Sequence, residues 1–367
     1  MSIPGENTLT DRAQKGRGSI SRRDGRFERL NTERVDDGWQ AKGKDEPDPL
    51  RTTLNDERPR AIISRNKSPD IGFDRSINPY RGCEHGCVYC YARPTHAYLG
   101  LSPGLDFETR LFAKPNAAEL LRRELAKPGH RCATIMLGAN TDAYQPVERD
   151  RGITRAILEV LNECNHPVAI ATKSHLVTRD VDILADMARR NLASVGVSVT
   201  TLDNRLANKM EPRAAAPRRR LAAIKTLSEA GVPVAVMAAP MIPALTDWEL
   251  ERILEAASDH GAIGASYILL RLPLELKGLF NEWLLTHRPN AARRVMNKLR
   301  ESRDGNLYAS EFGTRMRGTG RHADMLASRF RLACKRFNLA HGTPARKKLD
   351  TTAFVPPQPL DGQMRLL

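Results

Sequence analysis

Three cysteines on one short stretch of the chain are the residues most able to do chemistry. Cys83, Cys87 and Cys90 are separated by three residues and then by two, and the aromatic Tyr89 directly precedes the third cysteine. Thiolates this close together can all face one soft metal centre, because thiolate is the ligand that iron–sulfur clusters and zinc prefer. The spacing therefore predicts a metal centre on residues 82–91, which we name the cysteine loop.

No fourth cysteine lies near this loop. A four-iron cluster held by three cysteines has one iron without a protein ligand, and chemistry can happen at that open iron. The alternative is a structural zinc with His85 as the fourth ligand. His85 lies between two of the cysteines, where reaching their metal would strain the backbone, and no second cysteine pair accompanies the loop. The residues favour a cluster and leave zinc or free thiols as alternatives.

The three remaining cysteines, Cys132, Cys164 and Cys334, are isolated from one another, and we expect them to be small buried side chains. The start of the chain is polar and does not resemble a signal peptide, and no apolar stretch approaches the length of a membrane span. These features predict a cytoplasmic, reducing location, which also suits an oxygen-sensitive cluster.

The elements that must position the cysteine loop alternate between short β-rich runs and helical patterns, which is typical of parallel β/α units. One strand is predicted just before the loop, and five more follow at Thr134–Ala139, Val168–Thr172, Ser194–Val199, Val234–Ala239 and Ser266–Leu272. Helices are predicted at Ala117–Leu125, Ile153–Cys164, Val181–Arg190, Arg218–Ala230 and Asp247–Ser258, with a looser pair after Leu276. Six such strands form an open, partial (β/α)6 barrel of the TIM-like kind.

The two ends of the chain differ from this core. Residues 1–70 are rich in Arg, Asp, Gly and Pro and carry no apolar periodicity, so we expect a largely disordered extension. Residues 71–280 are predicted to form the core barrel. Residues 281–341 should be helical and pack on the barrel through Met325, Leu326, Phe330 and Leu332. The proline-rich residues 342–367 are expected to be a flexible tail.

Polar residues recur at the predicted carboxyl ends of the strands, where β/α barrels carry their working residues. Thr141 and Asp142 follow the second strand, Lys173 follows the third, and Ser198 lies at the end of the fourth. Arg271 lies near the end of the sixth strand. Because the strand bodies are apolar, this distribution indicates a site at one end of the barrel.

Several short motifs occur together in the chain. They are Tyr-Arg-Gly-Cys and Cys-x-Tyr-Cys-Tyr in the cysteine loop, Thr-Asp-x-Tyr-Gln-Pro-x-Glu from Thr141, the Thr-Lys-Ser turn at 172–174, Lys-Met-Glu-Pro-Arg at 209–213 and Pro-Met-Ile-Pro at 240–243. The cysteine spacing resembles the signature of the radical S-adenosylmethionine (AdoMet) superfamily. The combination resembles its branch related to spore photoproduct lyase, many of whose members have no assigned substrate. The resemblance spans roughly residues 76–273.

This resemblance implies that Cys83, Cys87 and Cys90 hold a [4Fe-4S] cluster. The reduced cluster would cleave AdoMet to a 5′-deoxyadenosyl radical, and the radical would abstract hydrogen from a substrate that the sequence does not identify. The core fold of the family is the same partial barrel. An electron donor such as flavodoxin or ferredoxin is implied as a partner.

The resemblance also implies roles for five residues around the cluster. Tyr89 would lie against the adenine of AdoMet, and Thr141 and Asp142 would meet its amino group. Lys173 and Ser198 would contact its carboxylate and ribose. The charges are consistent with these roles, because a zwitterionic ligand needs an anion for its ammonium and a cation for its carboxylate. A turn residue at Asp142 and a solvated charge at Lys173 are the alternatives.

Two features bear on the type of reaction. Spore photoproduct lyases use tyrosines at the positions of Tyr89 and Tyr91, so Tyr91 is a candidate hydrogen relay, with a packing aromatic as the alternative. Those enzymes also use a cysteine hydrogen donor near the end of the second strand. The chain has no cysteine at 140–142, and Cys132 lies before that strand. Lyase activity on DNA photodamage is therefore not expected.

The charge of the chain bears on its partners. The formal net charge of +15 is compatible with a nucleic-acid substrate or partner. Arginine clusters occur within predicted helices, for example at residues 218–220, where a solvated outer face is the simpler interpretation. Aromatic residues make up only 5% of the chain, which gives little support to a stacking platform for single strands. Two alternatives to an enzyme remain. One is a non-catalytic nucleic-acid-binding protein with a structural metal centre, and the other is an electron-transfer or metal-carrier protein.

Overall fold

The computed structural model describes residues 13–28, 50–341 and 348–358 of the 367 in the chain. Its main sheet has eight strands in the order β11-β10-β9-β8-β7-β6-β3-β2. They are β2 Ile63–Arg65, β3 Arg75–Ile77, β6 Ile135–Leu137, β7 Val168–Thr172, β8 Ala193–Ser198, β9 Val234–Met241, β10 Gly264–Leu269 and β11 Ala340–His341. Neighbouring strands are parallel except β2, which runs antiparallel to β3 at one edge. The sheet is therefore open, as a partial barrel is.

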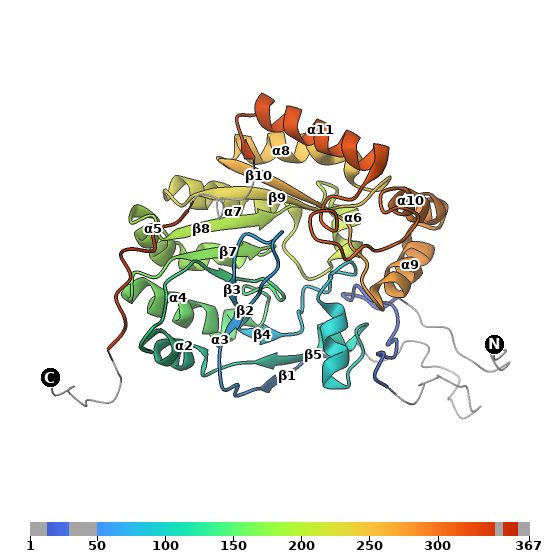
Figure 1. Ribbon diagram of the computed structural model, residues 1–367. Coiled ribbons are helices and arrows are strands. Elements are labelled where there is room, and N and C mark those ends of the chain that lie inside the picture. The colour runs from blue at the N-terminus through green and yellow to red at the C-terminus, as the bar shows by residue number, and fades with distance from the viewer. Residues whose placement is uncertain (1–12, 29–49, 342–347, 359–367) are drawn as a thin grey trace.

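Most of the connecting helices lie along the outside of this curved sheet, and α6 Asn204–Met210 lies near the carboxyl ends of its strands (Figure 1). The others are α2 Ala117–Leu125, α3 Glu148–Arg151, α4 Ile153–Glu163, α5 Val181–Arg189, α7 Pro217–Glu229 and α8 Leu250–Asp259, with 3-10 turns η2 His175–Asp180 and η3 Asp247–Glu249. Each long helix turns an apolar face inward, as Ile157 and Leu161 of α4 show by being fully buried. Strand β8 is buried along its whole length, which is typical of a parallel strand covered on both faces.

A second, three-stranded sheet flanks the cysteine loop. Strand β5 Arg110–Ala113 lies at its centre, parallel to β1 Thr53–Asp56 and antiparallel to β4 Tyr80–Arg81. Strand β4 leads directly into the cysteine loop, and the 3-10 helix η1 Arg93–Leu99 and helix α1 Asp106–Thr109 connect the loop to β5. The small sheet thus fixes the chain on both sides of the three cysteines.

The predicted fold class is confirmed. Strand β7 and helix α2 have the predicted bounds, and the ends of the other core elements differ from the predictions by no more than three residues. The strand expected just before the cysteine loop is β3. The looser helix pair is α9 Leu276–His287 and α10 Pro289–Glu301.

The expectation that residues 1–70 are largely disordered is wrong for the described parts of that segment. Residues 17–21, which we name the N-terminal strap, are buried against the cysteine loop. The backbone amides of Gly18 and Ser19 donate to the carboxylate of Glu108 at 2.9 and 2.8 Å. A Cβ on Gly18 would lie 1.7 Å from the carbonyl oxygen of Gly86, so only glycine fits there. Residues 1–12 and 29–49 lie outside the described residues.

Helix α11 Gly320–Arg336 packs on α8 and β10, as predicted for the C-terminal segment, but through only part of the predicted face. Leu326 and Phe330 are buried, whereas Met325 and Leu332 are 47% and 69% exposed. The helical repeat explains the difference, because residues 325 and 332 fall on the opposite side of the helix from residues 326 and 330.

The described part of the expected flexible tail, residues 348–358, also packs on the core. Leu349 is buried, and the Val355 amide donates to the Cys164 carbonyl at 2.9 Å. Phe354 contacts the rings of His130 and His166, with ring centroids 5.2 and 5.3 Å away. This segment therefore covers the amino ends of the strands, opposite the cysteine loop.

Candidate active site

The cysteine loop is held in place by backbone hydrogen bonds to its surroundings. The Cys83 amide donates to the Phe107 carbonyl, and the Val88 amide donates to the Met210 carbonyl, both at 2.9 Å. Cys83 and Cys87 are buried, and Cys90 is partly exposed. The loop is therefore a fixed part of the fold that presents three thiols.

The surroundings of these thiols favour a soft metal group over free thiolates. Burial, with the nearby Glu211 carboxylate next in size, raises the pKa of Cys87 to about 12. Burial, with Asp142 next in size, also raises the pKa of Cys83 well above its usual range. Thiols in such a place lose their protons when a metal centre supplies compensating positive charge. The donor set of three cysteines fits a [4Fe-4S] cluster.

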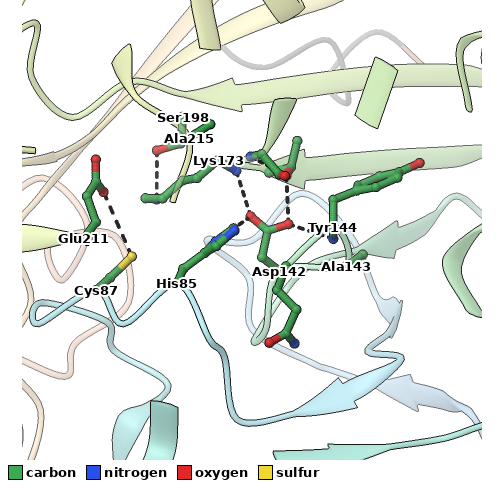
Figure 2. Close-up of polar contacts among 12 residues, drawn as sticks. His85, Cys87, Asp142, Ala143, Tyr144, Lys173, Ser198, Glu211 and Ala215 are labelled. Carbon is green, nitrogen blue, oxygen red and sulfur yellow. Dashed lines mark hydrogen bonds and ion pairs between the residues drawn. The ribbon is translucent and has the colours of Figure 1, made fainter. Parts of the chain in front are cut away.

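His85 does not face the cysteines as a fourth zinc ligand would. Its Nδ1 lies 3.4 Å from a carboxylate oxygen of Asp142, and Figure 2 shows its ring turned toward that residue. Burial lowers the pKa of His85. Among the described residues, no three His, Cys, Asp or Glu side chains are close enough to bind one metal ion. A four-iron cluster does not require such a group, because each thiolate ligates a different iron.

The Asp142 carboxylate is held by several donors at the end of β6 (Figure 2). One oxygen accepts from the Thr172 hydroxyl at 2.7 Å and from the Tyr144 amide at 2.9 Å. The other accepts from the Lys173 amide at 2.7 Å and faces His85. Asp142 is therefore a fixed negative charge beside the cysteine loop, as well as a turn residue.

Lys173 brings the opposite charge to the same end of the sheet. Its ammonium nitrogen donates to the Ser198 hydroxyl at 2.9 Å, and Ser198 donates in turn to the Ala239 carbonyl at 2.9 Å. The ammonium nitrogen also lies 5.7 Å from the centre of the Tyr89 ring. Lys173 is thus directed inward rather than being a solvated surface charge.

A buried network that sequence reasoning did not assign to the site joins the cysteine loop to α6 and α7. Glu211, directly after α6, lies 4.0 Å from the Cys87 sulfur and accepts hydrogen bonds from the Tyr89 hydroxyl and from Arg220. The Tyr89 hydroxyl also lies 3.1 Å from the Thr200 hydroxyl. Arg220 is 1% exposed. The interpretation of residues 218–220 as a solvated face is therefore wrong for Arg220, whose charge Glu211 balances inside the protein.

Two predicted site residues, Thr141 and Tyr91, donate side-chain hydrogen bonds to backbone carbonyls. The Thr141 hydroxyl donates to the Tyr80 carbonyl at 2.9 Å, which ties the end of β6 to β4. The Tyr91 hydroxyl donates to the Ala139 carbonyl, and 46% of the tyrosine is exposed. Tyr91 therefore reaches from the cysteine loop to the end of β6 while one part of it faces solvent.

The structure thus brings the predicted residues of the site to one end of the sheet. A cavity of about 230 Å³ lies elsewhere, within residues 302–319, and none of its lining residues belongs to the cysteine loop or to the ends of β6 to β9. The site is identified by its side chains rather than by a cavity. Glu211 lies in the Lys-Met-Glu-Pro-Arg motif, which was the one signal in the sequence that pointed to it.

Comparisons with known proteins agree with this geometry. Residues 77–257 match the radical SAM superfamily. An uncharacterized protein of Mycobacterium tuberculosis is 38% identical over 234 residues, which cover 62% of this chain and 69% of that protein. An uncharacterized protein of Methanocaldococcus jannaschii is 31% identical over 187 residues, which cover 51% and 67% of the two chains.

Solved structures of spore photoproduct lyase share the fold. A mutant with bound AdoMet and dinucleoside spore photoproduct superposes with a TM-score of 0.57 and 14% identity, over 78% of this chain and 80% of that one. A second mutant gives a TM-score of 0.56 and 15% identity, over 78% and 81%. With the matched residues and the three-cysteine loop, the chain belongs to the radical SAM superfamily, whose members are enzymes that use a [4Fe-4S] cluster and AdoMet.

Proposed function

We propose that this enzyme removes a hydrogen atom from an organic substrate bound at the carboxyl ends of the strands. When bound, the reduced cluster supplies the electron that cleaves AdoMet, which is the source of the family's hydrogen-abstracting chemistry. The observation that carries the proposal is the convergence of three cysteines, a fixed carboxylate and an inward lysine at one end of the sheet. Cys83, Cys87 and Cys90 would hold the cluster.

Asp142 and Lys173 are proposed to orient AdoMet by charge. AdoMet carries an ammonium and a carboxylate, and charge-assisted hydrogen bonds to both ends would fix its direction. Thr172 and the Lys173 amide hold the Asp142 carboxylate in one orientation, so little ordering is left to occur on binding. Thr141 would assist at the amino group, and Ser198 at the ribose.

The tyrosines of the cysteine loop are proposed to have different roles. Tyr89 is anchored through its hydroxyl by Glu211, which leaves its ring as a fixed surface for the adenine. Tyr91 is partly exposed beside the loop and would return hydrogen to the substrate radical.

The partners of the enzyme are proposed from its charge and from its fold. The net charge of +15 and the fold shared with spore photoproduct lyase support a nucleic-acid substrate. Cys132 precedes β6, at the opposite end of that strand from Asn140, so the chain lacks a cysteine donor beside the site and repair of DNA photodamage is not proposed. Flavodoxin or ferredoxin would supply the electron. Each helix of the described residues is too short or too polar to cross a bilayer.

The test is anaerobic reconstitution with iron and sulfide, followed by addition of dithionite and AdoMet and measurement of 5′-deoxyadenosine. The wild type should release it and bind about four irons per chain. Cys87→Ala should lose the product, whereas the matched variant Cys132→Ala should keep it, because Cys132 lies at the other end of the sheet. A wild type that binds a cluster but leaves AdoMet intact would refute the proposal and favour a metal-stabilised binding protein.

A further inference from the structure

One arginine beside the cysteine loop has no charged partner in the part of the chain that the structure describes. Arg271 follows β10 and is partly buried. Among the described residues, its side chain makes one weak hydrogen bond, to the sulfur of Met316 at 3.4 Å, and no acidic group lies within ion-pair distance of it. Its Nε is buried and has no hydrogen-bond partner in that part of the chain.

Two arginines of residues 302–319 are engaged differently. Arg315 forms a two-pronged ion pair with Asp70, with both nitrogen–oxygen distances 2.6 Å. Arg303 is 2% exposed and donates to the backbone carbonyls of Leu270 and Arg315 at 2.7 and 3.1 Å. These two residues hold residues 302–319 against the end of β10 and against the segment before β3. Arg271 donates a hydrogen bond to the same segment only at Met316 and has no ion pair among the described residues.

The guanidinium of Arg271 lies near two aromatic rings. Its central carbon is 5.5 Å from the ring centre of Tyr91 and 6.0 Å from that of Tyr308. Tyr91 adjoins Cys90 in the chain and bonds to Ala139 at the end of β6. Arg271 therefore lies beside the cysteine loop, with its charge oriented by the faces of two tyrosines.

We propose that Arg271 binds an oxyanion of the substrate, either a phosphate or a carboxylate, next to the reacting centre. The guanidinium fork matches both groups, and a partly buried cation without an ion-pair partner gains most from such a ligand. Tyr91 and Tyr308 keep the fork in place without neutralising it. This inference rests on the proposed function and names the substrate class of the same site.

The test measures binding of three probes by calorimetry to the reconstituted enzyme with saturating AdoMet at low salt. The probes are a thymidylyl-thymidine dinucleotide, its uncharged methylphosphonate analogue, and an acetylated diglutamate peptide. The wild type should bind one charged probe at least tenfold more tightly than the neutral analogue. Tighter binding of the dinucleotide would identify a phosphodiester as the source of the oxyanion. Tighter binding of the peptide would identify a carboxylate.

Arg271→Gln should weaken binding of that probe by about 10- to 100-fold, because a hydrogen bond to a charged group is lost. Arg271→Lys should keep part of the affinity, since it retains the charge but loses the fork. Arg317→Gln changes an exposed arginine within residues 302–319; it is the matched control and should bind like the wild type. Equal affinities of wild type and Arg271→Gln, or no preference of the wild type for a charged probe, would overturn the inference.

Release of 5′-deoxyadenosine is measured in the same preparations without any probe. If the wild type releases no 5′-deoxyadenosine but binds a probe in a way that depends on Arg271, the proposed function is refuted and the anion site is retained. The reverse pattern would refute the anion site alone.

Discussion

The two ends of the parallel sheet bury ionisable groups in opposite ways. At the carboxyl ends, Glu211 is paired with Arg220, and Asp142 accepts from several donors. At the amino ends, His130 and His166 pack against each other and Phe354, and the Nε2 atom of each ring is buried without a hydrogen-bond partner among the described residues. The carboxyl ends hold paired charges, whereas burial lowers the pKa of both imidazoles at the amino ends.

This difference shows what each end can contribute. Paired charges that cannot rearrange form a preorganised environment for a charged cofactor. Neutral imidazoles packed on a phenyl ring stabilise the fold but offer nothing to a zwitterionic ligand. The comparison predicts that changes at the carboxyl ends affect AdoMet binding, and that changes at the amino ends affect stability alone.

The largest expected effect follows from breaking the buried pair. Glu211→Gln would leave the Arg220 charge buried without its partner, which typically costs about 3–5 kcal/mol. Urea denaturation of the metal-free protein measures this loss of stability. Glu229→Gln removes an exposed partner of Lys225 and should change the free energy of unfolding by less than about 1 kcal/mol. Similar costs for the two variants would contradict the assigned role of Glu211.

The pH dependence of the free energy of unfolding should come in part from His166, at the amino ends of the strands. Burial lowers the pKa of His166 to about 4, so between pH 6.5 and 4 the unfolded chain binds a proton that the folded chain does not. The folded state therefore has its full stability above pH 6.5 and loses about 3 kcal/mol from this group as the pH falls to 4. His166→Leu should lose less stability than the wild type between pH 7 and 5 in urea denaturation. Parallel losses in the two proteins would rule out this contribution.

A smaller effect is expected for Asp142→Asn. The amide keeps one acceptor oxygen for Thr172 or Lys173 but loses the negative charge beside the cysteine loop. AdoMet affinity should fall about 10- to 100-fold, measured by calorimetry on the reconstituted protein. Asp182→Asn, on the outside of α5, is the matched change and should leave that affinity as it is. Unchanged affinity in Asp142→Asn would leave Asp142 as a turn residue only.

The smallest effect is expected for Phe354→Ala. The ring is only partly buried, so its removal should cost about 1–2 kcal/mol, less than for a fully buried phenylalanine. AdoMet affinity should stay at the wild-type value, because Phe354 contacts the amino ends of the strands. A fall in AdoMet affinity would mean that the two ends of the sheet are coupled, and it would contradict the expectation that changes at the amino ends affect stability alone.

Much of the fold could be predicted from local patterns. Helix α2 and strand β7 follow from their apolar spacing, and Asp142 and Lys173 follow from the rule that barrel sites form at carboxyl strand ends. The N-terminal strap could not be predicted in this way. Its order depends on the Glu108 carboxylate, which meets the Gly18 amide only in the folded protein.

Arg220 was missed for a similar reason. In the sequence it is one of three successive arginines, and charge runs usually lie in solvent. Helical geometry turns Arg218 and Arg219 outward and Arg220 inward, where Glu211 meets it. Recognising that pair requires knowing where the connection between α6 and α7 places Glu211, which the run of arginines does not state.

The N-terminal strap has a practical consequence for dividing the chain into working pieces. The region that matches the superfamily begins at residue 77, so a fragment cut to that boundary would lack the strap. Glu108 would then keep Arg93 as a partner but lose the Gly18 and Ser19 amides, and the backbone around Gly86 would lose its cover. The smallest piece of this protein that keeps the described surroundings of the cysteine loop therefore extends upstream at least to the strap.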